Sequence, residues 1–471
     1  MIPLRLAEVA AAVGGRVEPA SAGDVLVAAV MTDSRVATAV PALFVALPTE
    51  RADGHAHIAA AASAGAVAAL VADGRTPSTG ADGAGGPPRV VVADTWAALA
   101  ALAAHVRGAV DPLTVAVTGS YGKTTTKDLA AAALRTARRT VASRASHNNE
   151  LGVPLTLLAL EADTEVLVAE VGIRLAGDLD AAARLVRPDV AVVTAVGPVH
   201  LETLGDLDGV AREKGRLVAA LRPGGTAVLN ADDPRVAAMR RPDVATLTVS
   251  AAGAAADLVA GGVRDAGSGR VGAVVRTPWG TTELVPPLPG RHHLGNAMLA
   301  LAAAGVAGAD PAAAAAAIAT APTSASRAEL RRVAGITLLD DAYNASPPTV
   351  LGALVTLRDL HVDGRRWGVL GTMAELGSGS AALHREVGAA CADLDRLVVV
   401  GEGGALIAEG ARAAGLDADR IHEVADAAAA LAVLRAGVVA GDAVLVKASR
   451  VVGLDRTVEG LAAALAEGAA A

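Results

Sequence analysis

The sequence predicts an α/β protein of three domains, in which the central domain has a mostly parallel sheet flanked by helices. Three observations support this prediction. At 471 residues the chain is too long for one ordinary hydrophobic core. Apolar strand-like runs alternate with helix-compatible segments along most of its length. One of these runs also leads into a turn that is typical of phosphate-binding loops.

The first domain is expected over residues 1–110. It begins with MIPLRLAEVAAAVGG, in which charged residues interrupt an apolar pattern. That spacing predicts a short amphipathic helix stopped by Gly14-Gly15 and argues against a signal peptide. Short strand-like runs and helices then alternate, interrupted by a Gly/Pro/Ser-rich loop at residues 73–89.

Two further domains follow, a central one expected at residues 111–321 and a C-terminal one at residues 322–471. Asp111-Pro112 and the Pro-bearing stretch Thr320–Ser326 mark the central domain's limits. Its expected strands are Thr114–Val117, Glu165–Ala169, Ala191–Ala195 and Thr226–Leu229. The C-terminal domain is predicted to be Rossmann-like, with strands at Thr337–Leu339, Trp367–Leu370, Arg396–Val400 and Ala443–Val446.

The composition excludes several classes of function. Hydrophobic residues make up 53% of the chain, but many are alanine, and the alanine-rich stretch Ala297–Ala321 is broken by Asp310-Pro311, so no membrane span is predicted. The single cysteine, Cys391, excludes an internal disulfide and fits a reducing cytoplasm. A net charge of −8 without a basic stripe, together with 1% aromatic residues, argues against nucleic acid as a partner.

The stretch VAVTGSYGKTTTKDL, residues 115–129, carries the clearest chemistry. Gly119 and Gly122 allow backbone N–H groups to converge on a phosphate at a helix N-terminus. Lys123 would reach the terminal phosphates, and the Thr124 hydroxyl would bind magnesium. The usual pattern has a glycine where this chain has Val117. A plain strand-to-helix turn with an exposed lysine is the alternative, but the order of strand, glycines, Lys-Thr and helix favours a nucleotide site.

Three later residues are candidates for completing a magnesium-nucleotide site. Glu170 ends an apolar strand-like run, where a charged side chain must be paired or bind metal. His200 follows another apolar strand, and Lys214 lies on a predicted helix. Taken alone, His200 fits a capping or core histidine and Lys214 a solvated lysine. Their order after a phosphate loop and Glu170 favours metal binding.

These motifs resemble those of the Mur ligase family along nearly the whole chain, and most closely the members that act on D-alanyl-D-alanine. In the first domain the resemblance lies in TDSR (32–35), LFVAL (43–47) and DGH (53–55). In the central domain it lies in TGSYGKTTTK, SHNNELGVPLTLL (146–158), EVGIRLAGDL (170–179), VGPVHLETLG, AREKG and GRHHLGNAMLALAA (290–303). In the C-terminal domain it lies in SRAEL (326–330), DDAYNASP (340–347), GTMAELG (371–377) and LVKASR (445–450). The family uses a short phosphate loop without the first glycine, so Val117 fits it.

The resemblance implies an ATP-dependent amide ligase of peptidoglycan precursor synthesis. Such an enzyme joins D-alanyl-D-alanine to UDP-N-acetylmuramoyl-tripeptide through an acyl phosphate and releases ADP. Its implied cofactors are ATP and two magnesium ions, with Lys214 carrying an N-carbamate. A cytoplasmic monomer with these two small-molecule substrates is expected.

The resemblance also implies roles for individual residues. The implied catalytic residues are Lys123, Glu170, His200 and Lys214. The implied ATP contacts are Gly119, Ser120, Gly122, Lys123, Thr124, Thr125, Asn296, Arg327 and Asp341. The implied substrate contacts are Ser34, Arg35, Asn149, Tyr343 and Asn344, and the implied metal ligands are Thr124, Glu170, His200 and Lys214. The basic pair Lys447 and Arg450, at a strand end, fits a substrate contact, a helix-capping feature or a salt-bridge feature.

Three positions depart from the family pattern, and several rival functions fit the sequence less well. His293 stands where related ligases often have Asn, Ser346 replaces a common Asn, and Thr372 replaces an acidic residue. The nearest rival is a sister ligase with another amino-acid acceptor; the D-N-P-R stretch of a diaminopimelate-adding enzyme is missing. TDSR argues against a folylpolyglutamate ligase. A silent nucleotide-binding scaffold is disfavoured because the catalytic set is intact, and a GTPase because N-K-x-D is absent.

Overall fold

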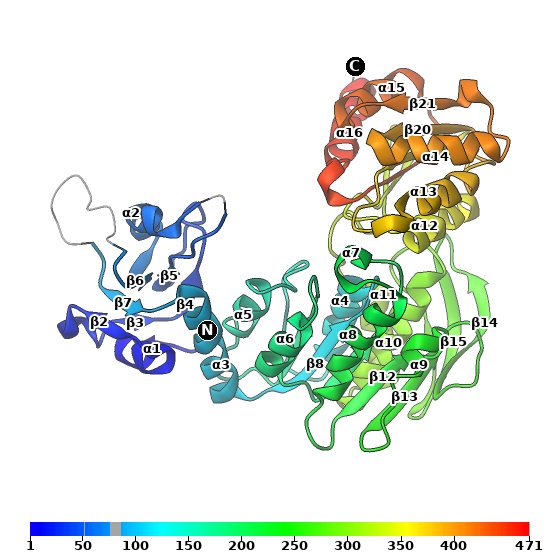
Figure 1. The fold of residues 1–471 in the computed structure, drawn as a ribbon. Coiled ribbons are helices and arrows are strands. Elements are labelled where there is room, and N and C mark those ends of the chain that lie inside the picture. Colours follow the sequence, from blue (N-terminus) through cyan, green and yellow to red (C-terminus); the bar gives the residue numbers. More distant parts are fainter. Residues whose placement is uncertain (51, 76–85, 471) are drawn as a thin grey trace. The chain divides into compact units, whose positions relative to one another are not determined.

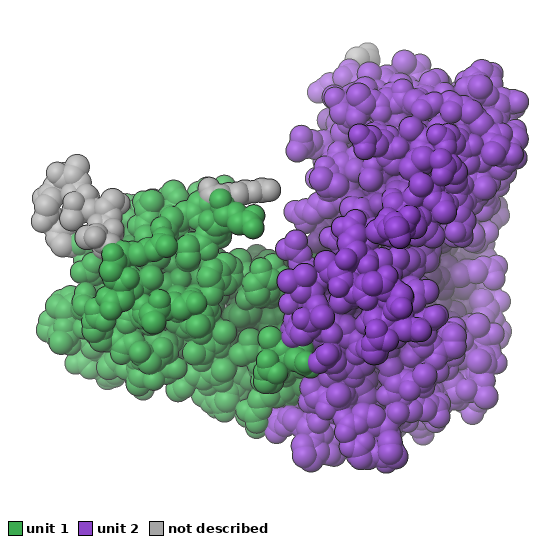
Figure 2. Space-filling view, viewed as in Figure 1, with its two compact units in different colours: residues 1–115, 138–171, 180–188 green, residues 116–137, 172–179, 189–471 purple. Residues whose placement is uncertain are grey.

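The computed structural model describes residues 1–50, 52–75 and 86–470. The chain divides into two compact units, coloured separately in Figure 2. The first contains residues 1–115, 138–171 and 180–188, and the second contains residues 116–137, 172–179 and 189–471. Helices and strands alternate along most of the chain (Figure 1).

A five-stranded sheet forms the N-terminal part of the chain, in the order β2-β7-β6-β5-β4. Strands β4 to β7 run parallel, and β2 joins antiparallel at the edge. Helix α1 ends at Gly14, whose φ of 64° confirms the predicted glycine stop. The predicted loop at residues 73–89 is described only at its two ends, because residues 76–85 lie outside the described part. The elements are β1 (Leu4–Arg5), α1 (Leu6–Val13), β2 (Arg16–Glu18), β3 (Leu26–Val27), β4 (Ala29–Met31), β5 (Ala42–Val45), α2 (Ile58–Ser63), β6 (Ala66–Ala72), β7 (Arg89–Val92) and α3 (Thr95–Val110), with 3-10 turns at Ala20–Ala22 and Gly54–His57.

The central sheet has nine strands in the order β16-β15-β14-β13-β12-β11-β8-β10-β9. Its strands are β8 (Leu113–Thr118), β9 (Thr140–Ala142), β10 (Val166–Glu170), β11 (Val190–Val193), β12 (Thr226–Asn230), β13 (Ala245–Ser250), β14 (Leu258–Asp265), β15 (Val271–Thr277) and β16 (Gly280–Leu284). Its helices are α4 (Lys123–Leu134), α5 (Gly152–Leu157), α6 (Asp178–Val186), α7 (Leu201–Leu204), α8 (Leu207–Ala219), α9 (Pro234–Ala237), α10 (His292–Val306) and α11 (Pro311–Ala319).

The predicted central strands are confirmed to within one or two residues, and the sheet is mostly parallel as expected. Fully buried strands such as β11 read as continuous apolar runs, which is why they can be found in the sequence. The antiparallel extension β14-β15-β16 was not predicted. The alanine-rich stretch forms two helices, and the Asp310 side chain caps the second one by accepting from the Ala313 N–H at 2.8 Å. None of the helices in the described residues combines the length and apolar character needed to cross a bilayer.

The C-terminal domain has a six-stranded sheet in the order β17-β18-β22-β19-β20-β21. Strands β18 to β22 pair in parallel, and β17 joins antiparallel at the edge. The elements are β17 (Glu329–Val333), β18 (Ile336–Asp340), α12 (Pro347–Asp359), β19 (Arg366–Gly371), α13 (Ser380–Ala389), β20 (Arg396–Val400), α14 (Gly401–Ala413), β21 (Ile421–Val424), α15 (Ala427–Gly437), β22 (Ala443–Lys447) and α16 (Asp455–Ala470), with 3-10 turns at Gly377–Gly379, Ala418–Arg420 and Arg450–Val452.

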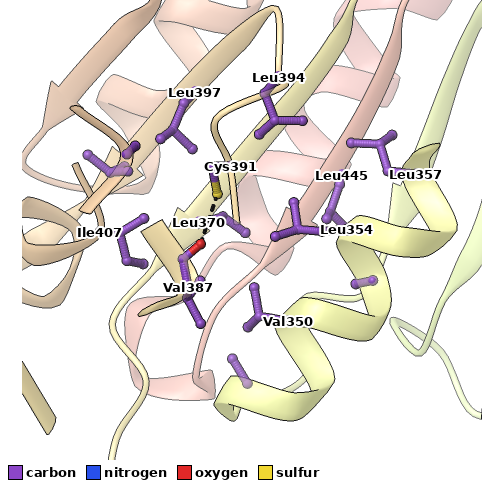
Figure 3. Close-up of a cluster of buried hydrophobic side chains, with 14 of the residues drawn as sticks. Val350, Leu354, Leu357, Leu370, Val387, Cys391, Leu394, Leu397, Ile407 and Leu445 are labelled. Atoms are coloured by element: carbon purple, nitrogen blue, oxygen red, sulfur yellow. Dashed lines mark hydrogen bonds between the residues drawn. The ribbon is translucent and has the colours of Figure 1, made fainter. Parts of the chain in front are cut away.

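Helices cover both faces of this sheet. One apolar core joins α12, α13 and α14 to the sheet, and Figure 3 shows Cys391 within it, beside Leu394 and Val387. The Cys391 Sγ donates to the Val387 carbonyl at 3.3 Å, and burial raises the pKa of this thiol to about 12. A second core on the opposite face joins α15 and α16 to the sheet. The expected Rossmann-like architecture is therefore confirmed.

Candidate active site

The predicted phosphate loop is a tight turn between β8 and α4. Gly119 has a φ of 151°, and Gly122, at the helix N-cap, has a φ of 79°. The first N–H groups of a helix have no partner within the helix, so a helix N-terminus such as that of α4 is a common place for an anion to bind. The Lys123 ammonium folds back over the turn and donates to the carbonyls of Gly119 at 2.7 Å and Ser120 at 3.3 Å. Thr124 and Thr125 lie in the first helical turn and are buried.

The missing first glycine has a structural explanation. Val117 is fully buried inside β8, which continues through Thr118. The strand therefore occupies the position where a longer phosphate loop would begin. What remains is the four-residue turn Gly119–Gly122, which leads directly into α4.

Both glycines of the turn are required by close neighbours as well as by backbone conformation. A Cβ on Gly119 would lie 1.9 Å from the Thr194 hydroxyl oxygen. A Cβ on Gly122 would lie 2.5 Å from the Asn296 side-chain oxygen. The second contact places Asn296, a predicted ATP contact on α10, against the phosphate turn.

The chain that follows β11 fixes the back of this turn. The Ser120 N–H donates to the Ala195 carbonyl at 2.8 Å, and the Ser120 hydroxyl accepts from the Gly197 N–H at 2.8 Å. Thr194 donates its hydroxyl to the Tyr121 carbonyl. The Ser120 side chain therefore holds the loop in place through Gly197.

Lys214 on α8 is a buried amine close to the phosphate turn. It is 1% exposed, and within the described residues neither a hydrogen bond nor an ion pair holds its side chain. Burial lowers its pKa well below the usual lysine value, and the positive charge of Lys123 lowers it further. Glu213 acts in the opposite direction, but its carboxylate already binds Arg216 at 2.8 Å. Burial and the charge of Lys123 therefore both favour the neutral form of the Lys214 amine.

His200 lies in a loop that contacts the C-terminal domain. Its Nδ1 pairs with the Glu375 carboxylate, and the Leu201 N–H donates to the Glu375 carbonyl at 3.1 Å. His200 and Glu375 both have left-handed backbones, with φ values of 54° and 63°, which are uncommon outside glycine. The hydrogen bond from His200 lowers the pKa of Glu375. A carboxylate on one ring nitrogen is a common way to orient a histidine whose other nitrogen binds metal.

The C-terminal candidates form a network at the ends of β18 and β22. The Arg327 guanidinium lies 4.0 Å from the centre of the Tyr343 ring. Lys447 is 3% exposed; its ammonium donates to the Asp341 carboxylate and, at 3.0 Å, to the Asn344 carbonyl. Lys447 therefore forms a salt bridge, which is one of the roles that the sequence predicts for it. It also holds the segment that carries three predicted ligand contacts.

His293, which departs from the family pattern, places a buried, neutral imidazole ring beside Asn296. Its Nδ1 is 3.5 Å from the Asn296 amide nitrogen, and its Nε2 is buried without a partner among the described residues. Burial lowers the pKa of His293 well below the usual histidine value, with a smaller contribution from His292. The ring centres of His292 and His293 are 4.1 Å apart.

The remaining predicted residues belong to the first unit. Glu170 ends β10 as predicted and is fully buried; its Oε1 accepts from the Asn148 amide at 2.6 Å, and its Oε2 has no partner in the described chain. Asn149 caps the start of α5 by accepting from the Gly152 N–H at 2.9 Å. The Arg35 guanidinium makes a two-pronged contact with Asp33, and Ser34 is half-buried.

No group of three or more His, Cys, Asp or Glu side chains is arranged to hold a metal within the described residues. Magnesium in ATP-dependent enzymes commonly binds one or two protein groups, with phosphate and water supplying the other ligands. In the first unit, the Glu170 Oε2 is buried and has no hydrogen-bond partner among the described residues, and a carboxylate oxygen is a ligand that magnesium prefers. In the second unit, the Thr124 hydroxyl is an oxygen ligand of the kind that magnesium prefers. Each of these two residues therefore fits magnesium by its own chemistry.

Asn148, Glu375 and Thr194 were not predicted as site residues, although each contacts a predicted one or its turn. Asn148 and Glu375 stand inside stretches already singled out, SHNNELG and GTMAELG. Those stretches were the available signal. Asn148 contacts Glu170 across 22 positions of the chain, and Glu375 contacts His200 across 175 positions. Motif spacing cannot reveal contacts between residues so far apart in the sequence.

Comparison with known proteins shows similarity to one family. The family described as "Mur ligase middle domain" matches residues 117–304, and "Mur ligase, glutamate ligase domain" matches residues 326–450. The UDP-N-acetylmuramoyl-tripeptide--D-alanyl-D-alanine ligase of Mycobacterium leprae is 37% identical, covering 96% of this chain and 97% of that protein. The ligase of the same name from Escherichia coli is 34% identical, covering 85% and 87%.

Solved structures give the same result. A crystal structure of MurF from Acinetobacter baumannii superposes with a TM-score of 0.85 at 27% identity, covering 98% of this chain and 99% of that one. MurF ligase from Thermotoga maritima in complex with ADP has a TM-score of 0.78 at 27% identity, covering 93% and 98%. With a phosphate turn, a buried lysine and an α/β C-terminal domain arranged as described, the chain belongs to the Mur ligase family.

Proposed function

We propose that this protein joins D-alanyl-D-alanine to UDP-N-acetylmuramoyl-tripeptide, with conversion of ATP to ADP and phosphate, in peptidoglycan precursor synthesis. One observation carries the proposal: a relative named for this reaction is 37% identical and covers 96% of this chain and 97% of its own length. The phosphate turn and the buried amine of Lys214 support the ATP chemistry independently of those names.

ATP is needed because a carboxylate is a poor electrophile. Its negative charge repels nucleophiles, and its leaving group would be oxide. In the proposed first step a carboxylate oxygen of the tripeptide attacks the γ-phosphorus of ATP, the bond to the β-γ bridging oxygen breaks, and ADP leaves. The resulting acyl phosphate has phosphate as its leaving group, so an amine can displace it.

The chain's own residues supply charge stabilisation for this step. The N–H groups at the start of α4 and the Lys123 ammonium would bind the phosphate oxygens, on which negative charge is spread during phosphoryl transfer. Asn296, against Gly122, would hold the nucleoside side together with Arg327 and Asp341. Magnesium held by Thr124 and Glu170 would neutralise further charge on the same oxygens.

Lys214 is proposed to carry an N-carbamate. A neutral amine attacks the carbon of CO₂, releases one proton and becomes an anionic oxygen ligand. The lowered pKa of Lys214 favours this reaction, because only the unprotonated amine has a free electron pair. The carbamate and His200 would then be ligands of a second magnesium ion, with Glu375 orienting the His200 ring.

In the proposed second step the amine of the dipeptide attacks the carbonyl carbon of the acyl phosphate. A tetrahedral intermediate forms, the amine loses a proton, and inorganic phosphate leaves. Tyr343 and Asn344 are proposed contacts of the dipeptide, and Ser34, Arg35 and Asn149 of the UDP-linked substrate. Because Arg327 and Asp341 belong to the C-terminal domain, closure of that domain over ATP is proposed to precede chemistry.

The domain limits 1–110, 111–321 and 322–471, a monomeric state and a cytoplasmic location complete the proposal. The function is tested by phosphate release from purified protein with ATP and magnesium. Release is expected only when UDP-N-acetylmuramoyl-tripeptide and D-alanyl-D-alanine are both present. Equal turnover with single amino acids as acceptors would assign the chain to a sister ligase instead.

A further inference from the structure

The C-terminal sheet changes winding direction at β22. The chain leaves β18 and β19 towards α12 and α13 on one face of the sheet. It leaves β22, which lies between those two strands, towards α16 on the other face. Ligands of parallel α/β sheets bind beside the carboxyl end of a strand where the winding reverses in this way. The segment that follows Lys447 is therefore where a ligand of this domain is expected.

Most polar groups at this position are already engaged. Lys447 is bound to Asp341 and Asn344, as described above. The Ser449 N–H donates to the Thr372 carbonyl at 3.0 Å, and the Ser449 hydroxyl accepts from the Ala374 N–H at 2.9 Å. These contacts hold the segment in place. They leave little capacity for a ligand.

Arg450 differs from these neighbours. It is exposed, and its guanidinium lies 5.3 Å from the centre of the same Tyr343 ring that Arg327 contacts. Across the described residues 1–50, 52–75 and 86–470, this guanidinium has no hydrogen-bond or ion-pair partner. The ring restrains the side chain by a cation–π contact without neutralising its charge. Arg450 is thus a positioned cation with its hydrogen-bond donors available.

The chemistry of the acceptor indicates what this cation binds. The amine of a dipeptide acceptor is the nucleophile, so it must be uncharged and free when it reacts. The terminal carboxylate is then the acceptor's charged handle, and a guanidinium matches a carboxylate with two parallel hydrogen bonds. We propose that Arg450 binds the terminal carboxylate of the dipeptide acceptor and is a specificity-determining residue. This inference rests on the proposed function.

Steady-state kinetics with two acceptors tests the inference. The acceptors are D-alanyl-D-alanine and D-alanyl-D-alaninamide, in which a neutral amide replaces the carboxylate. For the unaltered protein, KM is expected to be roughly 10- to 100-fold higher for the amide, the loss of one charge-assisted contact. Arg450→Ala is expected to raise KM for the dipeptide by a similar factor and to lose nothing further with the amide. KM for ATP is expected to stay within about twofold, because the contact is not part of ATP binding.

Two further variants complete the test. Arg450→Lys keeps a point charge but not the two-pronged contact, so an intermediate KM is expected. Arg435→Ala removes an exposed arginine on α15 and should behave like the unaltered protein. If Arg450→Ala does not fold, Arg450→Gln gives the same readout.

The inference is overturned if the Arg450 variants prefer the dipeptide to its amide as strongly as the unaltered protein does. It is also overturned if KM for ATP rises while KM for the acceptor does not change. Failure of the unaltered protein to use the dipeptide at all would instead contradict the proposed function.

Discussion

Lys123 lies close enough to the buried Lys214 for its positive charge to lower the pKa of that amine. The two lysines start from α4 and α8, and burial of Lys214 acts in the same direction as the neighbouring charge. Burial and the neighbouring charge therefore both favour the neutral amine of Lys214, the form that the proposed reaction with CO₂ requires.

Replacing Lys214 by alanine is expected to lower kcat by roughly 100-fold or more, the typical cost of losing a charged group at the reacting centre. High bicarbonate should not restore the variant, whereas the unaltered protein should lose activity in CO₂-free buffer and regain it on addition of bicarbonate. Arg212→Ala, an exposed position on the same helix, is the control. Full activity of Lys214→Ala would exclude the carbamate.

Lys214→Met is expected to be more resistant to urea than the unaltered protein in CO₂-free buffer at pH 7. The folded-state pKa of Lys214 is depressed, so between that value and the unfolded value of about 10.4 the unfolded chain binds a proton that the folded chain does not. Lys214 therefore costs more stability as the pH falls through this range. The difference between the two proteins should shrink as the pH rises towards 10, and a constant difference would contradict the shift.

Gly122→Ala is expected to abolish measurable ATP binding. The new methyl group would meet the Asn296 oxygen at 2.5 Å, and the left-handed backbone adds about 1–2 kcal/mol of strain. Gly308→Ala has a similar φ of 86° but no atom within 4 Å of the added carbon, so it measures the strain alone. Calorimetric titration of both variants with ATP should separate the effect of the contact with Asn296 from the effect of backbone strain. Equal affinity in both variants would show that the contact with Asn296 is unimportant.

Glu375→Gln is expected to lower activity about 10- to 100-fold and to raise the magnesium concentration needed for half-maximal rate, as for other partners of metal-binding histidines. The amide still fills the space beside His200 but no longer favours one orientation of the ring, which is proposed to bind metal. Glu202→Gln, on the exposed side of α7, is the matched control. An unchanged magnesium dependence would remove Glu375 from the account of the site.

Native Cys391 is expected to react with thiol reagents only after unfolding. Its thiol is buried in the core of Figure 3, and a pKa of about 12 keeps it protonated at pH 8. Reaction rates measured at rising urea concentration should follow the unfolding transition. Rapid labelling without denaturant would contradict the packing of this core.

The parts of the site that are adjacent in the chain are those that the sequence predicts well. The strand, both glycines, Lys123 and α4 occupy about twenty consecutive positions, and hydrophobic periodicity with glycine placement is a local signal. Val117 could be interpreted from the sequence only through the family resemblance. Its burial inside β8 now supplies the physical reason for the shorter loop.

Long-range pairings were not predictable in the same way. Lys447 and Arg450 look alike in LVKASR, yet one is buried against Asp341 and the other is exposed beside Tyr343. Residue spacing cannot distinguish these two outcomes. The loop after β18, whose residues contact Lys447 and Arg450, lies more than a hundred positions earlier in the chain. The antiparallel strands β14 to β16 were missed because their exposed faces break the continuous apolar runs that mark the parallel strands.

The central claim is ligation through an acyl phosphate, and one isotope experiment tests it most directly. UDP-N-acetylmuramoyl-tripeptide labelled with ¹⁸O in its terminal carboxylate is incubated with ATP, magnesium and D-alanyl-D-alanine, and the products are analysed by mass spectrometry. We expect one new amide product per ADP formed, with one ¹⁸O atom carried into the released phosphate. Release of unlabelled phosphate, or of phosphate without the amide product, would contradict it.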